Sequence, residues 1–234
     1  MFIDVVLNPA EIALLPQRDL SRTTCAVFDV LRATSSMITA LAHGASEIYP
    51  VCTIEDARAK RLQLPNALLG GERNGDPIEG FDVGNNPLDY TGFSGRQIIT
   101  TTTNGTVALR SCEHAPRVLV GALLNLDALC ASILSKKPEN VLLVCAGTFE
   151  TFALEDAYAA GLLVTMLGGA EVSDSALTVS AMARQFSSPL QALLAARNGR
   201  ALANRGWKEQ VEFCAMTSKF MAVGTMVGGV ITTQ

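Results

Sequence analysis

The pattern of apolar and polar positions predicts strands and helices that alternate along most of the chain. Short apolar runs rich in β-branched residues predict strands at 2–7, 24–30, 47–51, 67–69, 98–101, 117–120 and 141–145. Apolar residues at helical spacing predict helices at 37–42, 55–64, 126–135 and 152–167, and another from Ser188-Pro189 to Arg197 with Gly199 as its stop. The stretch 219–232 indicates strands broken by glycines. This alternation predicts a three-layer α/β/α fold with a largely parallel sheet.

The chain length fits one large domain or two small halves. At 234 residues and 49% hydrophobic composition, the chain can bury a sizeable core. We expect a single domain over 1–234. The repeated strand-turn-helix layout allows two similar halves within it, although the units share too little sequence to establish a duplication.

The stretch Ile98 to Leu109 predicts a buried strand, a hydroxyl-rich turn and the start of a helix near Thr106. Asn104 and Gly105 tolerate the tight backbone of a turn, and either Asn104 or Thr106 could cap the helix. Such a turn directs hydroxyl and N–H groups toward one point, which suits a phosphate or a sulfonate. The alternative is a threonine-rich strand end that is capped for stability alone.

Three polar turns follow predicted strands, at 29–36, 101–106 and 146–156. Ligands of parallel α/β sheets bind beyond the carboxyl ends of the strands. One site could therefore collect all three turns. The long segment 70–96, rich in Gly, Asn, Asp and Pro but with apolar residues among them, indicates an ordered functional loop.

Charge and hydropathy exclude several function classes. The net charge is −4 and no basic cluster is present, which argues against a nucleic-acid partner. No apolar run reaches the ~18 residues of a membrane span, and Asp4 lies where a signal peptide requires positive charge. We therefore expect a cytoplasmic protein. The six cysteines lack metal-type spacing and are expected to be buried thiols.

Six motifs follow one another along the chain. They are Asp29-Val30-Leu31-Arg32-Ala33-Thr34, Gly71-Glu72-Arg73-Asn74-Gly75, 80–87 (Gly-Phe-Asp-Val-Gly-Asn-Asn-Pro), 101–106 (Thr-Thr-Thr-Asn-Gly-Thr), Cys145-Ala146-Gly147 and Glu155-Asp156. Together and in this order they resemble the 2-phosphosulfolactate phosphatase (ComB-like) family. The resemblance spans about residues 25 to 165. It implies an α/β/α fold and Mg²⁺-dependent hydrolysis of 2-phosphosulfolactate to 3-sulfolactate, a step associated with coenzyme M biosynthesis. After Cys214-Ala215 the chain departs from the family pattern.

The chemistry of these residues fits phosphoester hydrolysis, because a phosphate dianion requires cations and donors around its oxygens. Arg32 and Arg73 supply forked cations, and carboxylates are the ligands that Mg²⁺ prefers. We predict Asp29, Arg32, Glu72 and Asn104 as catalytic residues. The predicted substrate-binding residues are Arg32, Arg73, Thr103, Asn104, Gly105 and Thr106, and the predicted Mg²⁺ ligands are Asp29, Glu72, Asp82, Glu155 and Asp156.

Structural roles are the alternatives for each residue. Asp29 could cap a helix, Arg32 could form an ion pair, and acids such as Glu72 and Asp82 also occur in turns. Glu155 and Asp156 would be favoured in a first helical turn by the helix dipole alone.

Two mechanisms stay open, direct attack of a metal-bound water on phosphorus or attack by Asp29 to give a phospho-enzyme. A non-catalytic binding protein for a small phosphate or sulfonate metabolite is the rival function. The expected partner is a small-molecule phosphoester, not nucleic acid or membrane, and a homodimer stays open.

Overall fold

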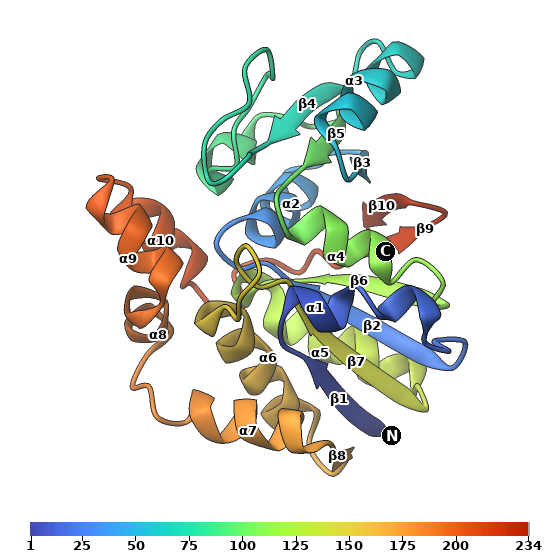
Figure 1. Cartoon of the computed structure of the whole chain (residues 1–234), viewed down its shortest axis with the longest axis vertical. Coiled ribbons are helices and arrows are strands. Elements are labelled where there is room, and N and C mark those ends of the chain that lie inside the picture. The colour runs from blue at the N-terminus through green and yellow to red at the C-terminus, as the bar shows by residue number, and fades with distance from the viewer. Residues whose placement is uncertain (234) are drawn as a thin grey trace.

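A ten-stranded, mostly parallel sheet forms the centre of the computed structural model, which describes residues 1–233 (Figure 1). The strands are β1 (Phe2–Val6), β2 (Thr23–Phe28), β3 (Glu47–Pro50), β4 (Leu68–Gly71), β5 (Gln97–Thr101), β6 (Arg117–Gly121), β7 (Asn140–Cys145), β8 (Glu171–Val172), β9 (Gly224–Val227) and β10 (Val230–Thr233). The helices are α1 (Pro9–Ile12), α2 (Ala33–Ala42), α3 (Ile54–Gln63), α4 (Gly105–Ser111), α5 (Leu126–Lys136), α6 (Leu154–Leu167), α7 (Asp174–Ala183), α8 (Pro189–Ala195), α9 (Arg197–Asn204) and α10 (Lys208–Cys214). Short 3-10 turns occupy Leu15–Gln17, Pro87–Thr91 and Leu123–Asn125.

The sheet consists of two blocks of parallel strands, which run in opposite directions and are joined by a hairpin. Its strand order is β4-β5-β3-β10-β9-β6-β2-β7-β1-β8. The pairs within β4-β5-β3 and within β6-β2-β7-β1-β8 are parallel, whereas β9 and β10 pair antiparallel with each other and with the strand on either side. The two blocks therefore differ in size, three strands against five, and the carboxyl-terminal hairpin connects them.

Strand β2 shows why the sheet is covered on both faces. All six of its residues are buried, as expected for a central parallel strand. Ala26 and Phe28 pack into the core with α5, α6 and α7, whereas Cys25 and Val27 pack with α2 and α4 on the opposite face. This alternation confirms the predicted three-layer α/β/α architecture. Helices α8, α9 and α10 form a group beside these layers, on the left of Figure 1.

The strands through β7 lie where the apolar pattern predicts them, but the carboxyl-terminal third differs. Helices α7 and α10 were not predicted. The prediction of one helix from Ser188-Pro189 to Arg197, stopped by Gly199, is wrong. Helix α8 ends at Ala195, and Gly199 lies inside the next helix, α9. A Cβ on Gly199 would meet the Leu193 carbonyl oxygen at 1.8 Å, so this glycine permits a close helix crossing instead of stopping a helix.

Within residues 1–233, no helix has the length and apolar character needed to cross a bilayer. The six cysteines are unpaired thiols. Five are buried, as predicted, whereas Cys52 is exposed and departs from the prediction.

Candidate active site

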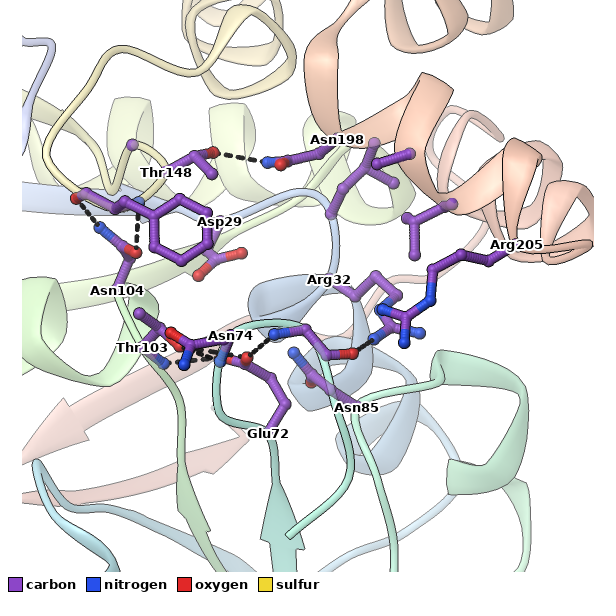
Figure 2. A pocket seen from close by; sticks show the side chains of 16 residues that line it. Asp29, Arg32, Glu72, Asn74, Asn85, Thr103, Asn104, Thr148, Asn198 and Arg205 are labelled. Atoms are coloured by element: carbon purple, nitrogen blue, oxygen red, sulfur yellow. Dashed lines mark hydrogen bonds between the residues drawn. The ribbon is translucent and has the colours of Figure 1, made fainter.

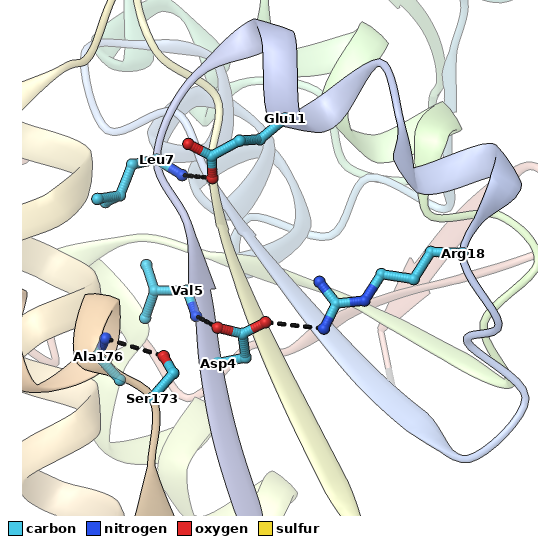
Figure 3. A network of polar contacts seen from close by, with 7 residues as sticks. All are labelled: Asp4, Val5, Leu7, Glu11, Arg18, Ser173 and Ala176. Carbon is cyan, nitrogen blue, oxygen red and sulfur yellow. Dashed lines mark hydrogen bonds and ion pairs between the residues drawn. The ribbon is translucent and has the colours of Figure 1, made fainter.

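A pocket of about 300 Å³ lies where the turns after β2, β4, β5 and β7 meet (Figure 2). Asn85, further along the segment between β4 and β5, and residues of helix α9 complete its walls. The lining residues are Asp29, Leu31, Arg32, Glu72, Asn74, Gly75, Asn85, Thr103, Asn104, Gly147, Thr148, Phe149, Asn198, Ala201, Leu202 and Arg205. The predicted convergence of the three polar turns is therefore correct, and the turn after β4 joins them.

Asp29 follows β2 directly and points into the pocket (Figure 2). Its carboxylate accepts hydrogen bonds from the backbone N–H groups of Ala33, at 3.2 Å, and Gly105. Burial, followed by the negative charge of Glu72 and then of Glu155, raises the pKa of Asp29 to about 7, and the two backbone donors offset this only in part. Asp29 thus brings a costly charge into a site that already holds other carboxylates.

Glu72 follows β4, and only 7% of it is exposed. Its carboxylate accepts hydrogen bonds from the Gly75 N–H at 2.6 Å, the Thr103 N–H at 2.7 Å and the Thr103 hydroxyl at 3.1 Å. Thr103 and Glu72 therefore tie the turn after β5 to the turn after β4. Thr103, a predicted substrate-binding residue, lines the pocket, but its backbone N–H and its hydroxyl both donate to Glu72.

Asn104, in the turn after β5, binds the loop that follows β7. Its Nδ2 donates to the Ala146 carbonyl at 3.2 Å and to the Phe149 carbonyl at 2.9 Å, and its Oδ1 accepts from the Phe149 N–H at 3.1 Å. The side chain does not cap α4. Instead, Thr102 and Thr106 cap that helix by exchanging hydrogen bonds at 3.1 Å between each backbone N–H and the other hydroxyl. Asn104 therefore holds the 146–149 loop against the pocket.

The first turn of α6 carries two buried acids, Glu155 and Asp156, just outside the pocket lining. Asp156 accepts from the Val30 N–H at 2.8 Å and the Gly147 N–H at 3.1 Å, and so joins the turns after β2 and β7. Burial, then the charges of Glu155 and Asp29, raise its pKa well above the ordinary value. Burial also raises the pKa of Glu155, whose Oε1 accepts from Asn198 and whose Oε2 has no hydrogen-bond partner within residues 1–233.

Two guanidinium groups form the positive side of the pocket. Arg32 is 6% exposed and donates to the Gln210 side-chain oxygen and, at 3.2 Å, to the Gly75 carbonyl. Burial lowers its pKa from the ordinary arginine value. Arg205 donates to Asp76, and the guanidinium carbons of Arg32 and Arg205 lie 5.3 Å and 4.3 Å from the ring centroid of Trp207.

Four more predicted site residues lie outside the pocket lining. Asp82 forms an ion pair with Arg61 at 3.0 Å and accepts from the Leu69 N–H at 2.7 Å, away from the pocket lining. Arg73 donates to the carbonyls of residues 72 and 52 and to the Thr101 hydroxyl. Thr106 is buried in its cap with Thr102, and Gly105 packs against Asp29 rather than lining the pocket. The structure therefore does not bring these four to the pocket.

Sequence reasoning missed the contribution of the carboxyl-terminal helices. Asn198 and Arg205 line the pocket, while Gln210 and Trp207 support Arg32 from behind. The one available signal was the sole tryptophan of the chain, two residues after an arginine in a polar helical stretch. Long-range packing, rather than a local motif, carries these residues to the site.

The acids predicted as Mg²⁺ ligands do not gather into one centre. Within residues 1–233, no group of three or more His, Cys, Asp or Glu side chains is arranged to hold a metal ion. Two carboxylates, Asp29 and Glu72, do line the same pocket, and the charge of Glu72 raises the pKa of Asp29. A cation between them would relieve that repulsion.

Known proteins are similar in sequence to this chain over most of its length. The profile of the 2-phosphosulpholactate phosphatase family matches residues 11–229. A probable 2-phosphosulfolactate phosphatase from Carboxydothermus hydrogenoformans is 38% identical, covering 92% of this chain and 89% of its own. Proteins with the same name from Deinococcus radiodurans (39% identical, 87% of each chain) and Gloeobacter violaceus (41% identical, 82% of this chain and 83% of its own) are also similar.

Proposed function

Since this chain belongs to the 2-phosphosulpholactate phosphatase family, we propose that it hydrolyses 2-phosphosulfolactate to 3-sulfolactate and inorganic phosphate in the cytoplasm. The observation that carries the proposal is a pocket with carboxylates on one side, Asp29 and Glu72, and guanidinium groups on the other, Arg32 and Arg205. A small ester with several acidic groups matches this arrangement, because forked cations bind its oxygens while a carboxylate serves the reaction at phosphorus.

Magnesium fits the negative side of the pocket. Mg²⁺ is usually bound by one or two carboxylates, with waters and substrate phosphate completing its shell. Asp29 and Glu72 supply that number, and their mutual repulsion indicates a local excess of negative charge. When bound, the ion would neutralise charge on the phosphate oxygens. Asp82, Glu155 and Asp156 are not part of this proposed set, because none of them lines the pocket.

Asp29 is the proposed reacting residue. In one route its carboxylate attacks phosphorus, the ester P–O bond breaks, and the leaving alkoxide takes a proton from solvent; water then attacks phosphorus, which releases phosphate and regenerates the carboxylate. In the other route Asp29 removes a proton from the water that attacks phosphorus, the ester P–O bond breaks, and the proton passes to the leaving alkoxide. Ala33 and Gly105 hold the carboxylate in place for either route. Acid quenching of a turnover with ³²P-labelled 2-phosphosulfolactate distinguishes them, because only the first route leaves the label on Asp29 as an acyl phosphate.

A phosphate-release assay tests the function. The substrates are 2-phosphosulfolactate, 2-phospholactate and phosphoglycolate, each with Mg²⁺ and with excess chelator. We expect release from 2-phosphosulfolactate that requires Mg²⁺ and disappears in Asp29→Asn. Full release in chelator contradicts the role of the metal. If no ester is hydrolysed with Mg²⁺ present, the site instead serves a protein that binds a small phosphate or sulfonate metabolite.

A further inference from the structure

Two side chains hold Arg205 at the rim of the pocket. Its guanidinium carbon lies 4.3 Å from the centroid of Trp207, and Nη2 donates to Asp76 in the loop after β4. Its Nη1 lies 3.5 Å from the position that a Cβ on Gly75 would occupy. With 42% of the side chain exposed, the guanidinium stays accessible to a ligand. Arg205 is thus an oriented cation that bridges α9 and the opposite wall.

The arginine pair has one ion-pair partner within residues 1–233, Asp76. Both hydrogen-bond partners of Arg32, the Gln210 side chain and the Gly75 carbonyl, are neutral. The only ion pair found for Arg205 within residues 1–233 is Asp76, whose side chain is 60% exposed and therefore strongly solvated. The indole of Trp207, which lies near both guanidinium groups, offsets their repulsion only weakly. Two guanidinium groups held in this way favour an anion within their reach.

The arrangement along the pocket identifies the group that Arg205 would meet. Asp29 and Arg205 lie on opposite sides of the pocket, with Arg32 between them (Figure 2). The phosphate must lie at Asp29 if that residue reacts. In 2-phosphosulfolactate the phosphate and the carboxylate are attached to the same carbon, whereas the sulfonate is one carbon further away. The sulfonate is therefore the group best placed to extend toward Arg205.

We propose that Arg205 binds the sulfonate of the substrate and thereby selects sulfonated 2-phospho acids over 2-phospholactate. This inference rests on the function proposed above. A sulfonate stays ionised at every working pH and offers three equivalent oxygens, which suits a forked donor that is always charged. Arg32, deeper in the pocket, is left for the phosphate or carboxylate. Specificity then comes from a residue of the carboxyl-terminal helices, outside the motif-bearing turns.

The sole tryptophan provides a direct binding signal, because Trp207 contacts the guanidinium under test. The intact protein is titrated with 3-sulfolactate and separately with inorganic phosphate, following Trp207 fluorescence and repeating each titration by calorimetry. Arg205→Met should weaken 3-sulfolactate binding by roughly 10- to 100-fold, the range for loss of a charge-assisted hydrogen bond, and leave phosphate binding within about threefold. Arg205→Lys should fall between the two. Arg200→Met removes the same charge from an exposed position of α9 and should behave as the parent.

Steady-state kinetics with two substrates provide the second test. In Arg205→Met, kcat/KM should fall roughly 10- to 100-fold for 2-phosphosulfolactate and within about threefold for 2-phospholactate. Equal losses for both substrates, or unchanged 3-sulfolactate binding, overturn the assignment, as does a parent that binds no 3-sulfolactate. A parent that binds 3-sulfolactate through Arg205 but releases no phosphate refutes the proposed reaction while leaving the sulfonate site intact. A melting curve for each variant excludes misfolding, and Arg205→Gln replaces Met if that variant does not fold.

Discussion

Replacing Gly105 with alanine should damage catalysis more than folding. Gly105 opens α4, and a Cβ there would lie 2.5 Å from Asp29 Oδ2, 2.9 Å from Ala33 Cβ and 3.0 Å from Asp29 Cβ. Its φ is not positive, so alanine can adopt the backbone conformation. The perturbation is therefore steric and directed at the proposed reacting carboxylate. Restoring ordinary contact at 3.4 Å requires a shift of about 0.9 Å, since 3.4 minus 2.5 is 0.9.

These distances set the expected magnitudes. A misplacement of about 1 Å costs roughly 100-fold in rate, so we expect kcat to fall by about that factor. Overpacking costs roughly 1 to 3 kcal/mol of unfolding free energy, and the gain from Gly to Ala in a helix returns about 0.5 to 1 kcal/mol. The net loss of about 0 to 2.5 kcal/mol corresponds to a fall in Tm of at most about 10 °C.

The assay pairs steady-state kinetics with a melting curve. Gly161→Ala is the matched control, because its Cβ would meet the Val179 carbonyl oxygen at 2.2 Å, inside the α6–α7 packing and away from the pocket. It should lower Tm and leave kcat near the parental value. A Gly105→Ala variant with parental kcat would refute the reasoning, whether or not its Tm falls, because it would show that the Asp29 position does not limit turnover.

Two further predictions concern Asn104 and Asp29. Asn104→Ala removes three hydrogen bonds to the 146–149 loop. We therefore expect kcat/KM to fall roughly 10- to 1,000-fold and amide hydrogen exchange in 147–151 to accelerate. Exchange rates equal to those of the parent would show that Asn104 does not hold this loop in place. For Asp29, the folded pKa of about 7 exceeds the ordinary 3.8, so the metal-free folded state retains the proton between these values and stability must fall as pH rises through that window. The contribution is at most about 4 kcal/mol at 1.36 kcal/mol per unit. Urea unfolding in chelator at several pH values should show the decline in the parent but less of it in Asp29→Asn; identical slopes would contradict the buried charge.

The proposed site was partly predictable from the sequence because its turns are local features. Asp29, Glu72, Thr103 and Asn104 each follow a strand whose apolar run marks its end. The rule that parallel strands end at one edge of the sheet covers the turns after β2 and β7 but not those after β4 and β5, because three antiparallel pairings reverse the block β4-β5-β3. The resemblance to the family added the expected phosphoester chemistry. Residue type alone could not separate acids that line the pocket from those that do not, because Asp82 pairs with Arg61 and Asp156 binds backbone N–H groups through long-range packing.

The sequence by itself determined the three-layer architecture and which polar turns follow strands, because strand and helix periodicity are properties of neighbouring positions. Only the tertiary structure decided which side chains stay free for a ligand. Asn104 fastens a loop 42 to 45 positions away, and Arg32 is held by Gln210, 178 positions away. Arg205 reaches the pocket only because α9 packs beside the layers. Such contacts depend on how distant segments pack together, and no local pattern in the chain encodes them.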